Sequence, residues 1–318
     1  MKGDHTIPLT VIGGSLGAGK TTLLRELVEG TTSARCHVIV NEIGEVLPGL
    51  GDFCVRSEDT TVLRGGCACC IRKEDLVEDL VSFANVGPRS DDAHVFLELS
   101  GIADPAPVIH TILNHPFLAH HFVVEEVVIV VDAFDWADSR QDDLWISQIA
   151  MADRCVLAKA DLVSSDELEK LSDVIGQINP GAVLVGSEYG RLRTERSRTS
   201  SDGVRPVSDA SRVGTEAAHG QLPDVTIINV ESEFEWGSFG VWLSLLLHRW
   251  GHDVLRVKGL VPVSPHQLAT VQAVHHAVFR PEHVESRGAS HGQLVFITRS
   301  IDTKLMTQSL EAFLGIEQ

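Results

Sequence analysis

The sequence lacks the surplus of basic residues that binding to nucleic acid or to an anionic membrane requires. Its 318 residues include 26 Lys and Arg against 44 Asp and Glu, which gives a net charge of −18. An acidic surface repels phosphate backbones and anionic headgroups, whereas it tolerates cations. We therefore expect no nucleic-acid partner and no membrane partner.

Long apolar runs are also missing. No stretch approaches the 18 consecutive apolar residues of a transmembrane helix. The opening residues, MKGDHTIPLTVIGG, contain no apolar segment followed by a small-residue cleavage site. The expected location is cytoplasmic.

Cysteine is scarce, and half of it lies in one place. Six cysteines in a chain of this length do not make the dense disulfide framework of a small secreted domain. In a reducing compartment, clustered cysteines are more often metal ligands or nucleophiles. Cys36, Cys54 and Cys155 lie apart from the cluster, and we expect them to be ordinary core or surface residues.

Short apolar runs alternate with helical patterns up to about residue 186, and this rhythm predicts an α/β domain with a mostly parallel sheet flanked by helices. Most runs are nearly unbroken, as expected of strands that helices cover on both faces. The expected strands are 9–12, 37–40, 95–97, 127–131, 154–157 and 182–185. The expected helices are 21–29, 73–84, 144–150 and 166–177.

Composition changes at residue 190 and again near residue 224. Residues 190–223 are rich in Arg, Ser, Thr, Gly and Asp without an apolar period, which predicts a flexible linker between a first domain at 1–189 and a second at 224–318. The second domain is expected to be a smaller α+β domain. Its expected strands are 225–230, 254–261, 268–274 and 294–298, and its expected helices are 239–250 and 303–314. Arg256 and Lys258 share a face of one strand, and we favour a solvated face; the alternative is contact with a nucleotide or partner.

Residues 13–22 read GGSLGAGKTT and match the phosphate-loop pattern G-x-x-x-x-G-K-[ST]. The segment follows a predicted strand and opens a predicted helix, which is the context that the motif requires. Backbone N–H groups and the helix N-terminus bind phosphates, Lys20 reaches the β and γ phosphates, and the Thr21 hydroxyl holds Mg²⁺. The predicted nucleotide contacts are Gly14, Ser15, Leu16, Gly17, Ala18, Gly19, Lys20, Thr21 and Thr22.

A P-loop NTPase also needs an acidic group near Mg²⁺ and the attacking water, usually where a neighbouring buried strand ends. Two predicted strands lead into such a group, Glu98 and Asp132. We favour Glu98, because Gly101 follows three residues later and can give its backbone N–H to the γ-phosphate. The alternative for either acid is a loop cap at a strand end.

The segment AKADL, residues 158–162, looks like a variant of the guanine signature N-K-x-D. The Asp161 carboxylate can accept from both N1–H and the exocyclic NH₂ of guanine, two donors that adenine lacks on that edge. The Lys159 stem can lie along the ring face. Ala158 replaces the usual asparagine and removes side-chain hydrogen bonds that brace the loops.

Cys67, Cys69 and Cys70 lie on a glycine-rich turn ahead of a helix rich in acids. Cys67 and Cys69 can chelate one ion from a tight loop, and a nearby helix N-terminus lowers thiolate pKa values. Soft thiolates select zinc, Cu(I) or a thiophilic Co(II) over Mg²⁺, and three of them leave a fourth position open, which suits transfer of the metal. The alternatives are a redox pair, a structural cluster, or metal binding without coupling to a nucleotide.

Two further carboxylates, Glu42 and Glu45, follow the second predicted strand at the place of a GTPase switch. Either one can touch the transition metal, water or Mg²⁺, and the sequence does not divide these roles. We group Glu45 with Lys20 and Glu98 as catalytic candidates and Glu42 with the cysteines as a metal ligand.

The segments GGSLGAGKTTLL, NEIGEV, GGCACC, ELSGIADPAPV, VVDAF, AKADL and RVKGL stand in the order found in the CobW/YjiA-type P-loop GTPases. The resemblance spans nearly the whole chain and is weakest across 190–223. It implies a phosphate loop at 14–22, a metal loop at the C-x-C-C cysteines, Glu98 and Gly101 as the acid and glycine of the nucleotide-sensing strand, and Asp161 as the guanine reader. Ala158 departs from the family pattern, and so does the missing histidine-rich tract of some members.

The resemblance implies a low-turnover GTPase that acts as a zinc or cobalt chaperone. We expect hydrolysis of GTP to GDP and phosphate with Mg²⁺, and delivery of Zn²⁺ or Co²⁺ to an unidentified client metalloprotein under nucleotide control. A homodimer is one option for the assembly. The alternatives are a P-loop small-molecule kinase or ligase with an incidental cysteine cluster, and a metal sensor or adaptor without hydrolysis.

Overall fold

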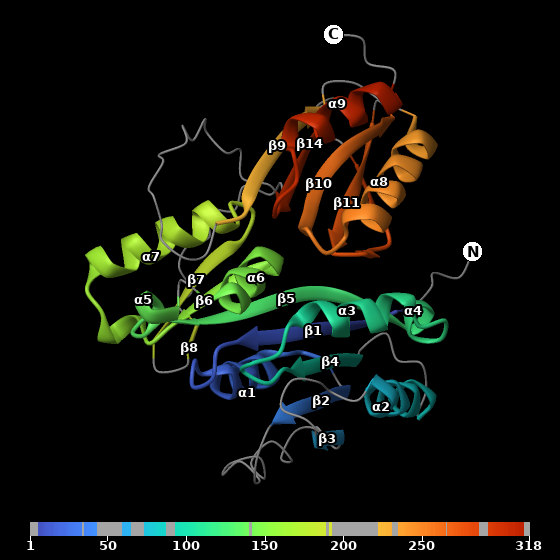
Figure 1. Cartoon of the computed structure of the whole chain (residues 1–318). Coiled ribbons are helices and arrows are strands. Elements are labelled where there is room, and N and C mark those ends of the chain that lie inside the picture. Colours follow the sequence, from blue (N-terminus) through green and yellow to red (C-terminus); the bar gives the residue numbers. More distant parts are fainter. Residues whose placement is uncertain are drawn as a thin grey trace. The chain divides into compact units, whose positions relative to one another are not determined.

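The computed structural model describes residues 6–33, 35–42, 59–64, 73–86, 93–139, 142–188, 191–192, 222–230, 235–264, 266–285 and 292–314. The chain divides into two compact units (Figure 1). The first contains Met1–Asp173 and Ala182–Ser197, and the second contains Val174–Gly181 and Arg198–Gln318. In the described ranges no helix has the length and apolar character needed to cross a membrane.

The first unit is built on an eight-stranded sheet in the order β3-β2-β4-β1-β5-β6-β7-β8. Strands β1 to β7 pair in parallel, and β8 pairs with β7 in antiparallel orientation. The prediction of a mostly parallel sheet is therefore confirmed. The strands are β1 (Ile7–Gly14), β2 (Arg35–Glu42), β3 (Asp59–Arg64), β4 (Ala93–Glu98), β5 (Phe122–Asp132), β6 (Arg154–Ala158), β7 (Val183–Glu188) and β8 (Arg191–Leu192).

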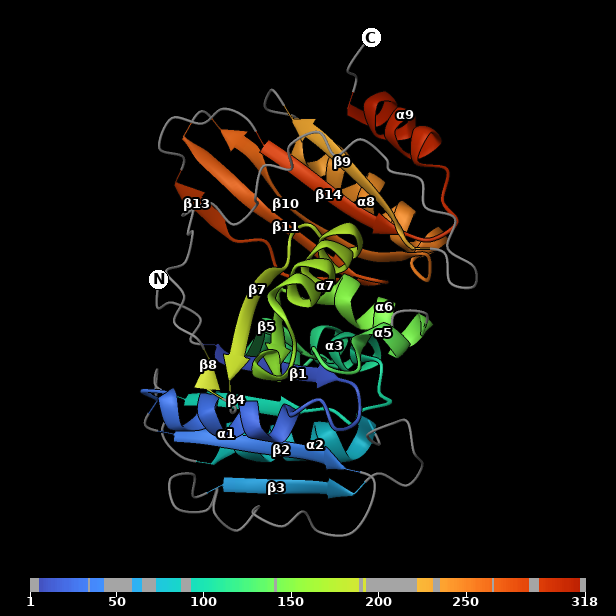
Figure 2. The same ribbon diagram turned by 90° about the vertical axis from the view of Figure 1, so that its left-hand side faces the viewer.

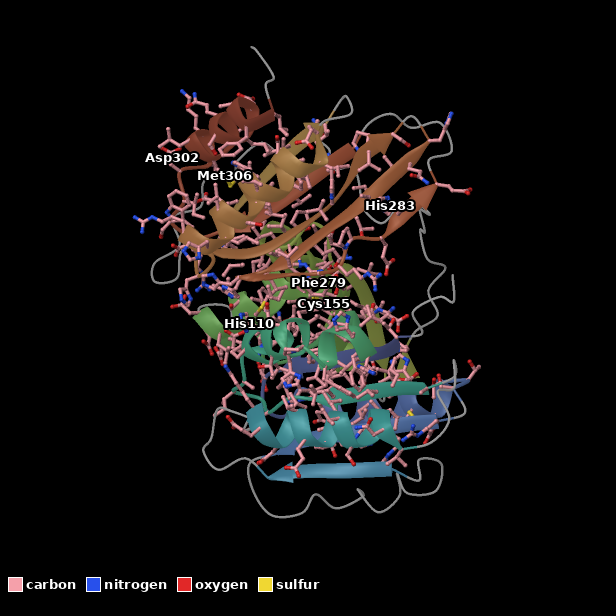
Figure 3. All side chains as sticks on the ribbon, turned by 90° about the vertical axis from the view of Figure 1, so that its right-hand side faces the viewer. His110, Cys155, Phe279, His283, Asp302 and Met306 are labelled. Atoms are coloured by element: carbon pink, nitrogen blue, oxygen red, sulfur yellow. The ribbon has the colours of Figure 1, made fainter. Side chains whose placement is uncertain are left out.

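Helices cover both faces of this sheet, as the unbroken apolar strands predict. Helix α1 lies on the face turned to the viewer in Figure 2, whereas α2 and α3 lie on the opposite face, seen in Figure 3. The helices are α1 (Lys20–Gly30), α2 (Lys73–Asn85), α3 (Pro105–Asn114), α4 (Leu118–His121), α5 (Trp136–Ser139), α6 (Asp143–Met151) and α7 (Ser165–Ile178), with a 3-10 turn at Ala160–Leu162.

The apolar face of α1 anchors the phosphate-loop helix to the sheet. Leu24 and Val28 are buried against a cluster of strand residues that includes Ile12, Val38 and Val130. Burial of a leucine or valine side chain stabilises the fold by about 1.5–3 kcal/mol. The start of α1 is therefore held at a fixed place above the ends of the central strands.

Several elements of the first unit were not predicted, among them α3 and β3. Helix α3 carries visible signals, because the Asp104 side chain accepts a hydrogen bond from the backbone N–H of Ala106 (2.9 Å) and Pro105 occupies the first turn. Strand β3, DTTVLR, has only two consecutive strongly apolar residues and lies at the sheet edge. A short edge strand of this kind has no periodic signature in the sequence.

The second unit is an antiparallel sheet packed against two helices. Its strands follow the order β12-β11-β10-β14-β9, and β13 also pairs with β11. Trp242 and Leu246 of one helix and Met306 of the other pack in one core with the strand residues Val257 and Phe296. Of these residues, Met306 is labelled in Figure 3. The elements are β9 (Asp224–Val230), α8 (Trp236–Trp250), β10 (Val254–Ser264), β11 (Gln267–Val274), β12 (Ala277–Val278), β13 (His283–Glu285), β14 (Gly292–Thr298) and α9 (Thr303–Leu314).

Arg256 of β10 corrects one expectation. A solvated strand face was the favoured interpretation for Arg256 and Lys258, yet the Arg256 side chain is 1% exposed. Its Nη2 donates a hydrogen bond to Oε1 of Gln272 (3.0 Å), and its guanidinium lies 5.4 Å from the centroid of the Phe279 ring. The prediction is wrong for Arg256 because cross-strand and aromatic partners replace water around the guanidinium.

Two glycines of the second unit predict opposite stability changes on substitution by alanine. At Gly240, inside α8, an added Cβ meets nothing within 4 Å, so Gly240→Ala should raise the free energy of unfolding by about 0.5–1 kcal/mol. At Gly259, in β10, the Cβ would lie 2.0 Å from the backbone oxygen of Gln293, and Gly259→Ala should lower that free energy by about 3 kcal/mol or more. Urea unfolding of the full chain measures both, and a similar change in both variants would contradict the assignment.

Candidate nucleotide site

The glycine-rich loop lies between β1 and α1, at the carboxyl edge of the parallel sheet. Gly14 has φ +129°, and a Cβ there would lie 2.2 Å from the backbone oxygen of Val130 in the neighbouring strand. Gly19, which directly precedes α1, also has a positive φ, +99°. Side chains at these two positions would be strained, so the backbone path that exposes N–H groups to a phosphate depends on glycine.

Lys20 and Thr21 open α1 and point back to the loop and to the adjacent strand. The Lys20 Nζ donates a hydrogen bond to the backbone carbonyl of Ser15 (2.9 Å), and Lys20 is 6% exposed. The Thr21 hydroxyl donates to Oε1 of Glu98 (2.8 Å). The structure therefore brings the last residue of β4 next to the first turn of the phosphate-loop helix.

The segment after β4 lies directly against the phosphate loop. The Leu99 N–H donates to the carbonyl of Ile12 (2.8 Å), which continues the β1 and β4 pairing beyond Glu98. At Gly101 an added Cβ would lie 2.5 Å from the backbone nitrogen of Leu16 and 2.6 Å from its Cα. The two loops approach each other closely enough that only a residue without a side chain fits at position 101.

The oxygen atoms at this place suit a hard divalent cation. The Thr21 hydroxyl and the Glu98 carboxylate are hydrogen-bonded to each other, and Glu98 is 1% exposed. Hydroxyl and carboxylate oxygens are the ligands that Mg²⁺ prefers, and Mg²⁺ sites at bound phosphates use only one or two protein oxygens. The chemistry of the donor set fits Mg²⁺.

A second loop stands at the end of β6. Lys159 adopts a left-handed backbone conformation (φ 57°), and its ammonium forms an ion pair with the Asp132 carboxylate at the end of β5. Asp161, in the 3-10 turn that follows, is exposed. An added Cβ on Gly19 would lie 3.9 Å from the Ala158 Cβ, so this loop borders the phosphate loop. The loops that follow β1 and β6, the two strands on either side of β5, thus border each other at this edge of the sheet.

A family model matches the part of the chain that carries this edge of the sheet. Residues 8–185 match the CobW/HypB/UreG nucleotide-binding domain. The chain belongs to this family. Residues 225–314 match the C-terminal domain of the cobalamin synthesis protein CobW, so both parts of a CobW-type protein are present.

Zinc appears in the names of three curated relatives of this CobW-family chain, and one of these names also contains GTPase. The chain is 36% identical over 196 residues to the zinc chaperone YjiA of Escherichia coli, and the matched segment covers 59% of each chain. It is 30% identical over 219 residues to the zinc-regulated GTPase metalloprotein activator 1 of Schizosaccharomyces pombe, which covers 66% of this chain and 50% of that one. A zinc chaperone CobW of Sinorhizobium matches at 29% over 84% of this chain and 85% of its own. The match thus spans only about half to three fifths of the first two relatives.

A solved structure supports the same fold. The Zn(II)-bound YjiA GTPase of E. coli superposes with a TM-score of 0.67 at 24% identity, covering 97% of this chain and 99% of that one. Together the comparisons confirm the predicted family and fold. One of these relatives is named a GTPase metalloprotein activator and the superposed protein a GTPase, which agrees with the predicted GTPase class.

Several predicted site residues of the CobW-family chain cannot be placed. Glu45 and the three cysteines Cys67, Cys69 and Cys70 lie outside the described residues, and only the backbone of Glu42 is described, in β2. Thr22 is exposed on α1. Among the described residues, no group of three or more His, Cys, Asp or Glu side chains is arranged to hold a metal ion.

The two candidate acids take different places in the structure. Glu98 contacts Thr21, whereas Asp132 contacts Lys159 and its Oδ1 accepts a hydrogen bond from the Phe134 N–H (3.0 Å). The contact between Asp132 and Lys159 was not predicted. The sequence offers one signal for it: Asp132 ends one predicted strand, Lys159 follows another, and these two strands are neighbours in the sheet.

Proposed function

We propose that this CobW-family chain is a GTP-hydrolysing metallochaperone. It binds zinc or cobalt through Cys67, Cys69 and Cys70 and delivers the ion to a client metalloprotein under the control of the bound nucleotide. The names of its relatives support zinc as the cargo, since two of them are called zinc chaperones and one a zinc-regulated metalloprotein activator.

The hydrogen bond between Thr21 and Glu98 is the observation that carries the proposal. It places a buried carboxylate at the first turn of the phosphate-loop helix, where a GTPase orients its attacking water. Mg²⁺, when bound, would neutralise charge on the phosphates. The Thr21 hydroxyl would hold that ion, Glu98 would orient the water, Lys20 would contact the β and γ phosphates, and the Gly101 N–H would bond the γ-phosphate.

The strand pairing offers a route from the nucleotide to the metal. In the register of β2 and β4, Val40 lies opposite Glu98, two residues before Glu42. The chain that follows Glu42 includes Glu45 and leads through β3 to the cysteines, the last of which lies three residues before the start of α2. A change at the Glu98 end of β4 therefore acts next to β2, the strand that ends at Glu42.

Base recognition in this proposal falls to Asp161 and Lys159. The Asp161 carboxylate is exposed at the edge beside the phosphate loop, where it can accept from N1–H and NH₂ of guanine. The wild-type chain should then bind GDP far more tightly than ADP. A small-molecule kinase that uses ATP would show the reverse preference and substrate-stimulated turnover.

Reciprocal titration tests the coupling of metal and nucleotide. Coupling between two sites is symmetric, so a GTP analogue that cannot be hydrolysed should change the affinity for Zn²⁺ by the same factor by which Zn²⁺ changes the affinity for the analogue. We expect a factor of about 5 to 150 in each direction, measured with a chromophoric zinc chelator and with a fluorescent nucleotide. Co²⁺ is titrated in parallel to compare the two cargoes. Equal zinc affinities with and without the analogue would contradict nucleotide control, and absent single-turnover hydrolysis would indicate a sensor or adaptor.

A further inference from the structure

The loop at residues 158–162, which carries the proposed base-reading residue Asp161, lacks the asparagine side chain that usually fixes such a loop. An asparagine in the N-K-x-D signature fixes neighbouring loops through its side chain, and Ala158 has no such groups. What remains at this position is a backbone contact, in which the Ala133 N–H donates to the Ala158 carbonyl (2.9 Å). That bond joins the ends of β5 and β6 but does not involve Lys159 or Asp161.

Lys159 needs a constraint, because its backbone is in a region that L-residues seldom occupy. Its φ of 57° is left-handed, and its carbonyl accepts from the Leu162 N–H (3.0 Å) to close the 3-10 turn that carries Asp161. A left-handed non-glycine residue persists when its surroundings hold it. The position of Asp161 therefore depends on what holds Lys159.

Asp132 is the residue that holds it. In the register of β5 and β6, Asp132 lies opposite Ala158, so the carboxylate stands one residue from Lys159. One carboxylate oxygen, Oδ1, accepts from the Phe134 N–H (3.0 Å), and the other pairs with the Lys159 ammonium. The Asp132 side chain is only 10% exposed and is fixed by its own turn, so it is a rigid anchor for a flexible lysine.

We propose that Asp132 is a specificity-determining positioning residue that, through its ion pair with Lys159, holds Asp161 in place and thereby lets the chain select guanine nucleotides despite Ala158. The inference rests on the proposed role of Asp161 in reading guanine. Guanine uses Asp161 and adenine does not, so loosening this loop weakens the binding of GDP and leaves that of ADP unchanged. Asp132 acts on the choice of base and makes no contact with the reacting phosphates in this scheme.

The test compares Asp132→Asn with wild-type chain in binding to fluorescent GDP and ADP. The asparagine keeps the oxygen that accepts from Phe134 and loses the charge that holds Lys159. We expect the GDP to ADP affinity ratio to fall by roughly 10- to 100-fold, through GDP alone, because a hydrogen bond between charged groups is lost. Asp135→Asn removes the same charge from an exposed residue of the same turn and should leave the ratio at its wild-type value.

A double-mutant cycle separates this role from a general effect on folding. Lys159→Gln should lower the ratio as well, and the double variant should lose no more than the single variants, because both remove one interaction. Additive losses in the double variant, or an unchanged GDP to ADP ratio in Asp132→Asn, would overturn the inference.

Equal loss of GDP and ADP affinity in Asp132→Asn, with a lowered unfolding midpoint, would also overturn the inference and would indicate that Asp132 has only a structural role. If the wild-type chain itself binds GDP and ADP equally, the proposed reading of guanine fails first, which is a distinguishable result.

Discussion

Glu98→Gln is expected to lower the single-turnover rate of GTP hydrolysis by about 10²- to 10³-fold, while GTP analogue binding stays close to that of the wild-type chain. A positioned carboxylate that orients and deprotonates water contributes on this scale. The glutamine has nearly the same volume, and its amide oxygen can still accept from the Thr21 hydroxyl, which now donates to Glu98 at 2.8 Å. Because Glu98 is 1% exposed, replacing its charge with a neutral amide does not add a burial cost.

The control for this variant changes another glutamate of the same sheet. Glu125→Gln, on the exposed surface of β5 near its start, should leave both turnover and binding unchanged. Rates are measured with enzyme in excess over GTP, so that product release does not limit them. An unchanged rate in Glu98→Gln would show that the catalytic water is oriented elsewhere, for example by Glu45. A loss of analogue binding equal to the loss of rate would instead assign Glu98 to holding the nucleotide.

The parts of this fold that depend on short segments of sequence, such as buried apolar strands and the phosphate loop, were predictable. The run 127–131 is apolar because β5 is covered on both faces, and the glycines and Lys20 of the phosphate loop show their chemistry within ten consecutive residues. The choice of Glu98 over Asp132 near Thr21 agrees with the observed contact, although its catalytic role stays a prediction.

The contacts that depend on strand order were not predictable. Asp132 and Lys159 are 27 residues apart and meet only because β5 and β6 are adjacent in register. The prediction that the Arg256 side chain is solvated was wrong for a similar reason, because its partners Gln272 and Phe279 come from other segments of the second unit. Alternation along one strand indicates which residues share a face, but it does not reveal what covers that face.

Two of the six thiols are buried in the sheet of the first unit. Cys36 and Cys155 are buried, and Cys155, labelled in Figure 3, is 0% exposed in β6. Burial raises the pKa of Cys36 from its ordinary value of 9.0 to about 11 and that of Cys155 to about 12. Both thiols therefore stay protonated at pH 7, and their contribution to stability is full below pH 9 and falls as the pH rises toward 11 to 12. A thiolate, and not a thiol, is the ligand of zinc.

Replacing Cys67 and Cys69 together with serine should therefore abolish tight zinc binding, whereas Cys36→Ala should leave it intact. Thiolate zinc sites bind with apparent free energies of about 12 kcal/mol, or about 3 kcal/mol for each of four ligands, so losing two ligands should weaken binding by roughly 10⁴-fold. Competition with a chromophoric chelator at pH 7 measures this affinity. GDP binding by the serine variant reports that the nucleotide site is still folded. If the serine variant kept its zinc affinity while Cys36→Ala lost it, the cargo site would lie in the sheet, and the link from Glu42 to the C-x-C-C loop would have no role in transfer.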